Sequence, residues 1–469
     1  MGTLYDDAPF FPLARLTPEH PHTAEAPPHR PHIVPRQEHS ISRSRISENA
    51  LRVLNRLNEA GFAAHLVGGA VRDLLLGASP KDFDIATDAR PEQVRALFRN
   101  CRLIGRRFRL AHVFFGQEII EVATFRAQAV LPEDEGEAET SDASRLADNG
   151  RILRDNVYGS LEDDAWRRDL TVNALYYSIK DFSVLDYVGG VPDLERRLIR
   201  LIGDPEQRYR EDPVRMLRVA RFAAKLGFEV EPGTAAPIAT MGHLLDDISS
   251  ARLYEESIKL LQCRHAVASL AQLRRFNLFG YLFLQTEDAL AGAFGALTEN
   301  MLQLGLANTA QRITEAKPVT PAYLYAFMLW GPLREALAER GGAALMNEVE
   351  IIGAGGDVFS AQAQQTGIPR RFSLAAREIW QLQARFHKRQ GRQPQRFLVH
   401  PRFRAAYDFL LLRRDAGEAG LDELCQWWTE FQALDESQQA LHLRHVNRDE
   451  GRRPHRRHKP AAPETEAAV

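Results

Sequence analysis

The segment from Gly68 to Thr87 limits the possible fold more than any other part of the chain. It reads GGAVRDLLLG and, after three residues, KDFDIAT. A short apolar run, residues 64–67, precedes the glycines, so the pattern predicts a strand, a tight turn, a helix and a second strand. Side chains two apart in a strand project from one face. Asp82 and Asp84 are therefore expected to point to the same place.

The two aspartates predict a metal site. Adjacent carboxylates repel each other unless a cation lies between them, and Mg²⁺ prefers one or two carboxylates together with phosphate oxygens and water. Gly68 and Gly69 leave space for backbone N–H groups and a helix N-terminus to approach a triphosphate, with Arg72 beside it. The alternative is that the aspartates lie on a solvated edge strand and that the glycines form an ordinary turn. This would explain either motif alone, but not both at this spacing.

Glu121 is a candidate for a third carboxylate. It lies in GQEIIEVATFR, where Ile120 and Val122 alternate with it and take the opposite face of a strand. Glu121 is then expected to line the same cleft as the aspartates. The alternative is an exposed strand residue without a role.

A second polar group follows in WRRDLTVNA, residues 166–174, whose apolar spacing predicts a helix. Guanidinium groups suit phosphate and ribose through planar paired donors. One carboxylate here, Asp169, is expected either to hold an arginine or to be the third metal ligand in place of Glu121. A salt-bridged helix surface is the alternative. The polar side of this predicted helix carries Arg167, Arg168, Asp169 and Asn173.

The segment REDPVR is expected to begin another helix, with Pro213 in its first turn. Asp212 and Arg215 are three residues apart and would be neighbours on the helix surface. A carboxylate and a guanidinium placed together can read the Watson–Crick edge of a base. A helix cap with a surface ion pair is the alternative.

The motifs described so far resemble, in their order along the chain, those of one known family. They are GGxVRDxLLG with DxD, RRD with the following Thr171 and Asn173, and EDPVR. The family is the class II nucleotidyltransferase family, which contains CCA-adding tRNA nucleotidyltransferases and bacterial poly(A) polymerases. The resemblance covers about residues 50–280. It implies an α+β polymerase-β-like nucleotidyltransferase head followed by an all-α neck, body and tail.

The resemblance also implies residue roles. Asp82 and Asp84 would bind two Mg²⁺ ions, the segment 167–169 would serve nucleotide binding and catalysis, and Asp212 with Arg215 would select the base. It gives Asp169 precedence over Glu121 as the third carboxylate. The long leader and the acidic residues 132–150 depart from the family pattern without touching these motifs.

Two stretches favour the poly(A) polymerases within that family. They are LIGRRFRLAHV, residues 103–113, with Arg106 and Arg107 as RNA-binding candidates, and HPRFRAAYDFLLLR, residues 400–413. The resemblance then implies template-independent transfer of AMP from ATP to RNA 3′-hydroxyls with release of pyrophosphate, promoting RNA decay. Expected partners are mRNA, decay intermediates, small RNAs and tRNA, and RNA-degradation proteins.

Two other functions remain as alternatives. A CCA-adding or A-adding tRNA nucleotidyltransferase would use CTP as well as ATP and would require a tRNA end. A non-catalytic RNA-binding protein would keep the fold without the chemistry, which the intact carboxylates and arginines of the motifs disfavour.

Composition shifts divide the chain. The 1–45 leader is rich in Pro and His and is expected to be disordered, residues 132–150 form an acidic loop, and the chain beyond Gly190 is almost entirely helical. The expected domains are a leader (1–45), a catalytic head (46–190), a helical neck with RNA and nucleotide contacts (191–280), a helical body with a C-terminal RNA-binding region (281–443) and a disordered basic tail (444–469).

Basic and aromatic residues alternate irregularly from Arg385 to Arg414. Lys and Arg neutralise phosphates, and aromatic rings offer stacking surfaces for single-stranded bases. A helical core with basic outer faces is the alternative. The tail GRRPHRRHKP is expected to meet RNA, or else to be a basic tail without a partner. The aromatic candidates are Phe386, Phe397, Phe403 and Tyr407, and the tail candidates are Arg452, Arg453, Arg456 and Arg457.

The remaining composition excludes several classes of protein. The three cysteines are far apart and form no CxxC pair, which argues against a disulfide framework or a structural zinc site and for a reducing compartment. No apolar stretch approaches the roughly 20 residues of a membrane span. The cytoplasm is therefore the expected location. The net charge of −2 conceals local basic segments that can bind a polyanion.

Overall fold

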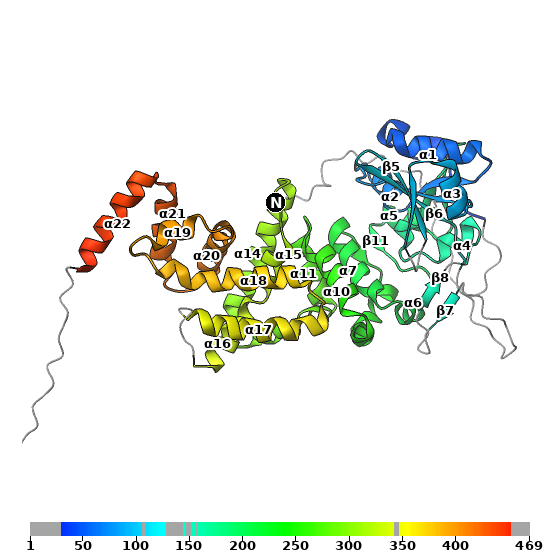
Figure 1. Ribbon diagram of the computed structural model, residues 1–469. Helices are drawn as coiled ribbons and strands as arrows, with labels where there is room; N and C mark the ends of the chain where they lie inside the picture. The colour runs from blue at the N-terminus through cyan, green and yellow to red at the C-terminus, as the bar shows by residue number, and fades with distance from the viewer. Residues whose placement is uncertain are drawn as a thin grey trace, which may run out of the picture. The chain divides into compact units, whose positions relative to one another are not determined.

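The computed structural model describes residues 30–105, 109–127, 144–146, 152–155, 157–341 and 347–451. The chain divides into two compact units. Unit 1 comprises Met1–Ile248 and Ala268–Tyr281, and unit 2 comprises Ser249–Val267 and Leu282–Val469. Both units are shown in Figure 1.

Unit 1 is built on an eight-stranded sheet, in which β3 and β6 are parallel and the other neighbours are antiparallel. The sequence correctly predicts three neighbouring strands, one from the apolar run at residues 64–67 and two from the alternating segments around Ile85 and Val122, but it misses the strand at residues 175–177. In spatial order the strands are β1 (His32–Val34), β10 (Val184–Asp186), β9 (Leu175–Tyr177), β2 (Ala64–Val67), β3 (Asp84–Thr87), β6 (Glu118–Thr124), β5 (Leu110–Phe115) and β4 (Cys101–Ile104).

Three helices pack around the strands β2 to β6 of this sheet (Figure 1). They are α1 (Glu48–Glu59), α2 (Gly69–Leu75) and α3 (Pro91–Leu97). The first is capped by Ser47, whose hydroxyl accepts hydrogen bonds from the N–H groups of Asn49 and Ala50. Its apolar stripe is buried as the helical spacing predicts, including Val53, Leu54 and Leu57.

Three expected boundaries differ from the structure. Residues 32–34, assigned to the disordered leader, pair with β10 and complete the sheet edge. Strands β7 (Ser144–Leu146) and β8 (Ile152–Asp155) form a hairpin that begins inside the expected acidic loop. The final helix, α22 (Glu436–Gly451), continues past the expected start of the tail. In the first two cases, backbone pairing with another strand orders residues whose composition alone favours disorder.

The helix expected over residues 166–174 is wrong. Helix α4 (Leu161–Trp166) ends there, a 3₁₀ turn η3 (Thr171–Asn173) follows, and β9 begins at Leu175. The backbone pairs with a distant segment instead: the N–H of Thr171 donates to the carbonyl of Arg200, and the N–H of Ile202 donates to that of Asp169. These long-range bonds outweigh the local helical spacing.

Unit 1 continues into short helices and a small two-stranded sheet. Helix α7 is amphipathic and buries Met216, Leu217 and Val219. The elements of this part of unit 1 are α5 (Gly190–Glu195), β11 (Leu198–Ile199), α6 (Pro205–Glu211), α7 (Val214–Leu226), β12 (Glu229–Val230), α8 (Pro232–Ala235), α9 (Ile238–Met241), η4 (Gly242–Asp247) and α11 (Ala266–Arg275), with α12 (Phe279–Leu282) at the end of the unit.

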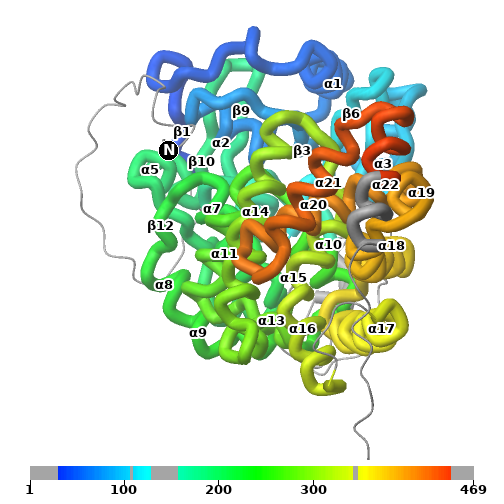
Figure 2. The backbone as a smooth tube through the Cα atoms, turned by 90° about the vertical axis from the view of Figure 1, so that its left-hand side faces the viewer, coloured from blue at the N-terminus to red at the C-terminus, as the bar shows by residue number. Residues whose placement is uncertain are grey.

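Unit 2 is helical throughout its described residues, as expected. Helix α16 packs against α13, α15 and α17 (Figure 2). The helices are α10 (Ser250–Leu261), α13 (Leu284–Ala291), α14 (Gly295–Thr314), α15 (Pro321–Met328), α16 (Trp330–Glu339), α17 (Glu348–Gln365), α18 (Arg370–Gln383), η5 (Ala384–His387), α19 (Gln393–Leu398), α20 (Phe403–Asp415), α21 (Asp422–Ala433) and α22.

The four aromatic residues expected to stack on RNA bases belong instead to the core of unit 2. Phe386, Phe397, Phe403 and Tyr407 are between 0% and 6% exposed and pack around Trp428 and its neighbours. The expected stacking surface is therefore wrong, and the alternative of a helical core with basic outer faces is right. In the part of the chain that the structure describes, no helix is long and apolar enough to span a membrane.

Candidate active site

Two acidic residues lie side by side where β3 and β6 pair, and a third lies just before β3. The parallel register places Asp84 directly beside Glu121, and paired residues in neighbouring strands share a face of the sheet. Asp82 lies two residues before Asp84 and precedes β3, and both aspartates are exposed whereas Phe83 between them is buried. The structure thus pairs Asp84 with Glu121, and Asp82 is near enough for its charge to act on Asp84.

The electrostatics of this group fit a cation. Desolvation by the surrounding protein raises the pKa of Asp84 to about 6, with the charges of Glu121 and Asp82 adding to the effect and those of Arg168 and His112 opposing it. Three oxygen ligands of like charge suit a hard divalent cation. Within the described ranges, no three His, Cys, Asp or Glu side chains already form a metal-binding cluster. The fit is therefore one of charge and ligand type.

His112 was missed by sequence reasoning. It faces Glu121 across the antiparallel pair of β5 and β6, and its Nε2 lies 3.3 Å from a Glu121 carboxylate oxygen. This contact places the imidazole beside the carboxylate that adjoins Asp84. The sequence could have indicated this residue, because His112 lies between Ala111 and Val113, two apolar residues that alternate with it along β5.

The glycine turn lies beside these carboxylates. Gly68 caps α2 with a φ of 71°, a conformation that strains any residue with a side chain. A Cβ at Gly68 would lie 3.6 Å from Nη1 of Arg168, so the Arg168 guanidinium adjoins the turn. Strand β2 connects the two features, because Val67, directly before the turn, pairs with Asp84.

Arg168 is held in place by two partners that the sequence analysis did not select. Its guanidinium donates to Asp164, with nitrogen–oxygen distances of 3.1 and 2.9 Å, and to the hydroxyl of Tyr176 at 3.0 Å. The Tyr176 hydroxyl in turn donates to Asp164 at 2.7 Å. Asp164 stands four residues before Arg168, a helical spacing that could have revealed the pair.

Arg72 makes contacts other than those expected. The side chain is 1% exposed, and Nη1 donates to Oδ1 of Asn173 at 2.5 Å while Nε donates to Asp73 at 2.8 Å. Contact with a triphosphate would need these bonds to change. In this structure Arg72 and Asn173 form a buried link between α2 and η3.

Asp169 lies in a different set of contacts from Asp84. Its carboxylate accepts from Arg218 at 2.5 Å and from the N–H of Leu170 at 2.8 Å. Burial alone would raise the pKa of Asp169, but Arg218 and the Leu170 N–H hold it well below the usual range. Of the two candidates for the third carboxylate, the structure places Glu121 beside Asp84 and pairs Asp169 with an arginine.

Arg208 connects α6 to the chain at Arg167 and Arg168, and the sequence analysis did not select it. It donates to the carbonyls of Arg167 and Arg168 at 2.7 and 2.6 Å and to Glu211 at 2.9 Å. Burial and the nearby charge of Arg215 lower the pKa of Arg208 to about 10. Because it fixes two consecutive carbonyls, Arg208 sets the path of the chain that carries the Arg168 side chain.

Asp212 and Arg215, which the sequence predicts to select the base, have different hydrogen-bond partners within the described residues. Helix α6 ends at Glu211, and the Asp212 carboxylate accepts from the N–H of Val214 at 3.3 Å, at the start of α7. Arg215 donates to Glu211 at 2.9 Å and to the carbonyl of Arg208 at 2.7 Å. Glu211 is thus the carboxylate shared by Arg208 and Arg215.

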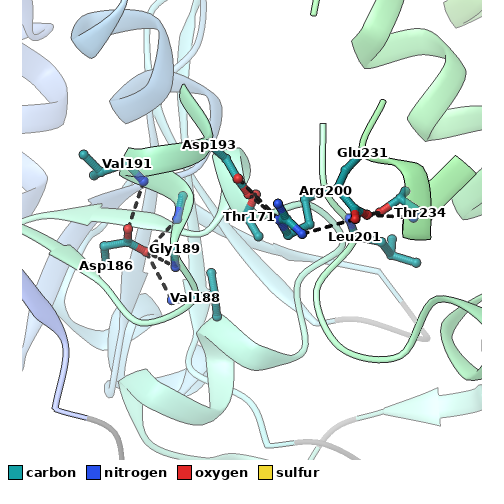
Figure 3. A network of polar contacts seen from close by, with 11 residues as sticks. Thr171, Asp186, Val188, Gly189, Val191, Asp193, Arg200, Leu201, Glu231 and Thr234 are labelled. Atoms are coloured by element: carbon teal, nitrogen blue, oxygen red, sulfur yellow. Dashed lines mark hydrogen bonds and ion pairs between the residues drawn. The ribbon is translucent and has the colours of Figure 1, made fainter. Parts of the chain in front are cut away.

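A polar network fixes η3 to the elements that follow it (Figure 3). Asp186 accepts hydrogen bonds from backbone N–H groups at the start of α5. Asp193, in the same helix, accepts from the Thr171 hydroxyl at 2.7 Å and from Arg200 at 3.1 Å. Arg200 also reaches Glu231, 3.4 Å away. Asp193 thereby ties η3, the turn that carries Asn173, to α5 and to Arg200.

Six predicted RNA-binding residues lie outside the described residues. They are Arg106, Arg107, Arg452, Arg453, Arg456 and Arg457.

Similarity to known proteins agrees with this geometry. Residues 64–200 match the family described as “Poly A polymerase head domain”, residues 227–290 the “Probable RNA and SrmB-binding site of polymerase A”, and residues 347–461 the “Polymerase A arginine-rich C-terminus”. Poly(A) polymerase I of Salmonella typhi is 49% identical over 447 residues, which cover 94% of this chain and 95% of that protein. The chain belongs to the poly(A) polymerase I family.

Other members of the family agree, among them poly(A) polymerase I of Escherichia coli O6:H1, 48% identical over 93% of this chain and 94% of that protein. The CCA-adding enzyme of Bacillus subtilis is 40% identical but covers only 49% of this chain. A solved tRNA-processing enzyme shares the fold with a TM-score of 0.55 at 21% identity, covering 84% of this chain and 99% of its own. The fold is therefore a polymerase-β-like nucleotidyltransferase head with a helical C-terminal region, as expected.

Proposed function

We propose that this protein adds AMP from ATP to the 3′-hydroxyl of RNA without a template, releasing pyrophosphate. The observation that carries the proposal is the juxtaposition of Asp84, Glu121 and the Arg168-flanked glycine turn within a chain of the poly(A) polymerase I family. Carboxylates for a cation beside donors for phosphate are what nucleotidyl transfer requires. The chain is accordingly an RNA adenylyltransferase.

Asp82, Asp84 and Glu121 would hold the two Mg²⁺ ions. When bound, Mg²⁺ supplies a lowered pKa for the RNA 3′-hydroxyl and neutralises charge on the leaving pyrophosphate. Asp169 is assigned a positioning role, because it is bonded to Arg218 and Leu170. The chain's own residues then bind, orient and neutralise the substrates.

Donors for the nucleotide surround the glycine turn. The backbone at Gly68 and Gly69 and the Arg168 guanidinium are proposed to contact the triphosphate, with Arg167 beside them. Arg72 supports this surface by fixing Asn173. Glu211 orients Arg215, which with Asp212 is proposed to select adenine.

The RNA ligands we propose are 3′ ends of mRNA, decay intermediates, small RNAs and tRNA. The matches to an RNA-binding region and to an arginine-rich C-terminus support RNA as the substrate. Polyadenylation in RNA decay, with RNA-degradation proteins as partners, and a place in the cytoplasm complete the proposal; the scattered cysteines support a reducing compartment.

The deciding experiment extends a labelled, unstructured RNA primer with each of the four NTPs separately in Mg²⁺, beside a tRNA that lacks its terminal CCA. Long products from ATP alone on the generic primer are expected. Addition of C and A limited to the tRNA would assign the chain to the CCA-adding enzymes, and RNA binding without any extension would make it a non-catalytic RNA-binding protein.

A further inference from the structure

A basic cavity lies in unit 2, whereas the carboxylates, the glycine turn and the arginines of the candidate active site belong to unit 1. Its volume is about 280 Å³. It is formed by the start of α17, the segment around η5 and helix α19. Its lining consists of Glu348, Arg385, Lys388, Gln393, Arg396 and Phe397.

Positive charge exceeds negative charge in this cavity. Lys388 Nζ lies 2.8 Å from Oε1 of Glu348, and Arg385 Nε lies 3.8 Å from the same oxygen. The third cation, Arg396, is exposed and has no ion-pair partner among the described residues. One carboxylate therefore serves two cations while a third remains open to a ligand.

The cavity rests on a rigid floor. Phe397 is 6% exposed, and its ring lies 4.9 Å from that of Phe386 and 5.5 Å from that of Trp428. Because these rings pack against one another in the core, they offer no free face to a nucleobase. The accessible groups are guanidinium, ammonium and amide donors, which suit phosphate oxygens.

We infer that this cavity binds a phosphate group of RNA and that Glu348 occupies the place of that phosphate when RNA is absent. Both groups offer anionic oxygens to the same donors. RNA binding would transfer Lys388 and Arg385 from the carboxylate to the phosphate and give Arg396 its partner. The inference rests on the proposed function in taking RNA as the ligand.

The test compares two variants that each remove one negative charge. E348Q releases Lys388 inside the cavity, whereas the control E315Q releases Lys317 from a matching 2.7 Å contact outside it. Affinity for a labelled single-stranded oligoadenylate is measured at several salt concentrations. E348Q should bind about threefold more tightly, the size of one exposed ion pair, and E315Q should bind like the wild type.

Removal of a cation gives the opposite expectation. R396Q should weaken RNA binding and reduce the slope of log affinity against log salt by about 0.7, the value for one phosphate of a single strand, while R396K should restore both. Circular dichroism confirms that each variant is folded. Equal RNA affinities of E348Q, E315Q and R396Q at every salt concentration would overturn the inference.

AMP transfer by the wild type separates the two proposals. If the wild type extends RNA and the cavity variants bind RNA as tightly as the wild type, only the inference about the cavity is contradicted. A wild type that extends no RNA with any NTP contradicts the proposed function.

Discussion

The ionised form of Asp84 is disfavoured in the folded chain, first because the surrounding protein desolvates the carboxyl and then because Glu121 and Asp82 place negative charge beside it. Its pKa lies above that of an ordinary aspartate. The folded state therefore holds the proton more tightly than the unfolded state. In the absence of a cation, ionisation of Asp84 lowers the free energy of unfolding as the pH rises through about 4 to 6.

D84N should separate stability from activity. At pH 7 in EDTA we expect this variant to have a free energy of unfolding higher by about 1 kcal/mol, after allowance for solvent screening, and the gain should vanish below pH 4. In Mg²⁺ it should transfer no AMP, because a cation ligand is lost. Urea unfolding at pH 4 and pH 7 and primer extension check both parts.

D246N is the matched control, since Asp246 is exposed in the same unit. It should change neither quantity. Full activity of D84N in Mg²⁺ would remove Asp84 from the proposed metal site.

Single residues also show where the sequence was sufficient. The alternation around Phe83 agrees with its burial between the exposed Asp82 and Asp84, although β3 begins only at Asp84. The choice between Glu121 and Asp169 needed the structure, because it depends on which strand lies beside β3 and on the position of Arg218, 49 residues after Asp169. Neither is contained in local spacing.

At the level of elements, α5 packs closely against η3. A Cβ at Gly190 would lie 2.3 Å from the carbonyl oxygen of Thr171, and backbone cannot rotate away as a side chain can. The neighbouring Gly189 has open space around it and a φ of 80°. The two glycines therefore constrain the chain in different ways.

We expect G190A to lower the free energy of unfolding by about 3 kcal/mol through overpacking, and G189A by about 1 kcal/mol through backbone strain. G190A should also reduce AMP transfer, since it displaces the turn that carries Asn173. Urea unfolding and single-turnover primer extension measure the two effects. Similar losses in both variants would contradict the contact between α5 and η3.

The contacts of Arg208 lead to a prediction about the stability and activity of a variant in α6. R208M removes the donors to two backbone carbonyls and one partner of Glu211, so the free energy of unfolding should fall by about 3 kcal/mol. The path of the chain at Arg168 should loosen, which raises the KM for ATP. R210M, at an exposed arginine paired with Glu206, is the control and should leave both values unchanged.

The same elements explain why part of the fold was not predictable. Residues 166–174 have helical spacing, yet their backbone pairs with residues 200–202. Arg208 acts on carbonyls about 40 residues earlier, where no side-chain pattern marks the contact. Periodicity reports local preference, and these contacts are decided by chain topology.

For the whole molecule, the division into two compact units predicts two thermal unfolding transitions. The second unit contains a buried ionic cluster in which Glu418 accepts hydrogen bonds from Arg413, Arg334 and Trp330. Burial alone would raise the pKa of Glu418, but these donors hold it below the usual range. Stability from this carboxylate is present above its unfolded pKa and is lost as the pH falls through the folded value.

E418Q should therefore lower one transition and leave the other unchanged. The variant leaves two arginines without their buried carboxylate, which is expected to cost about 3 kcal/mol at pH 7 and much less near pH 3. Differential scanning calorimetry at both pH values measures the midpoint temperature of each transition. A uniform shift of both transitions would contradict independent units.

The parallel pairing of β3 with β6 has a consequence for how such a chain can vary. Asp84 and Glu121 adjoin each other through a ladder of backbone hydrogen bonds, although 36 residues separate them in the sequence. Insertions within the connecting segment leave the pair intact as long as the ladder keeps its register, whereas a slip by one residue turns Glu121 to the other face. Loops within this segment can therefore lengthen without separating Asp84 from Glu121, provided that the alternation of β6 is kept.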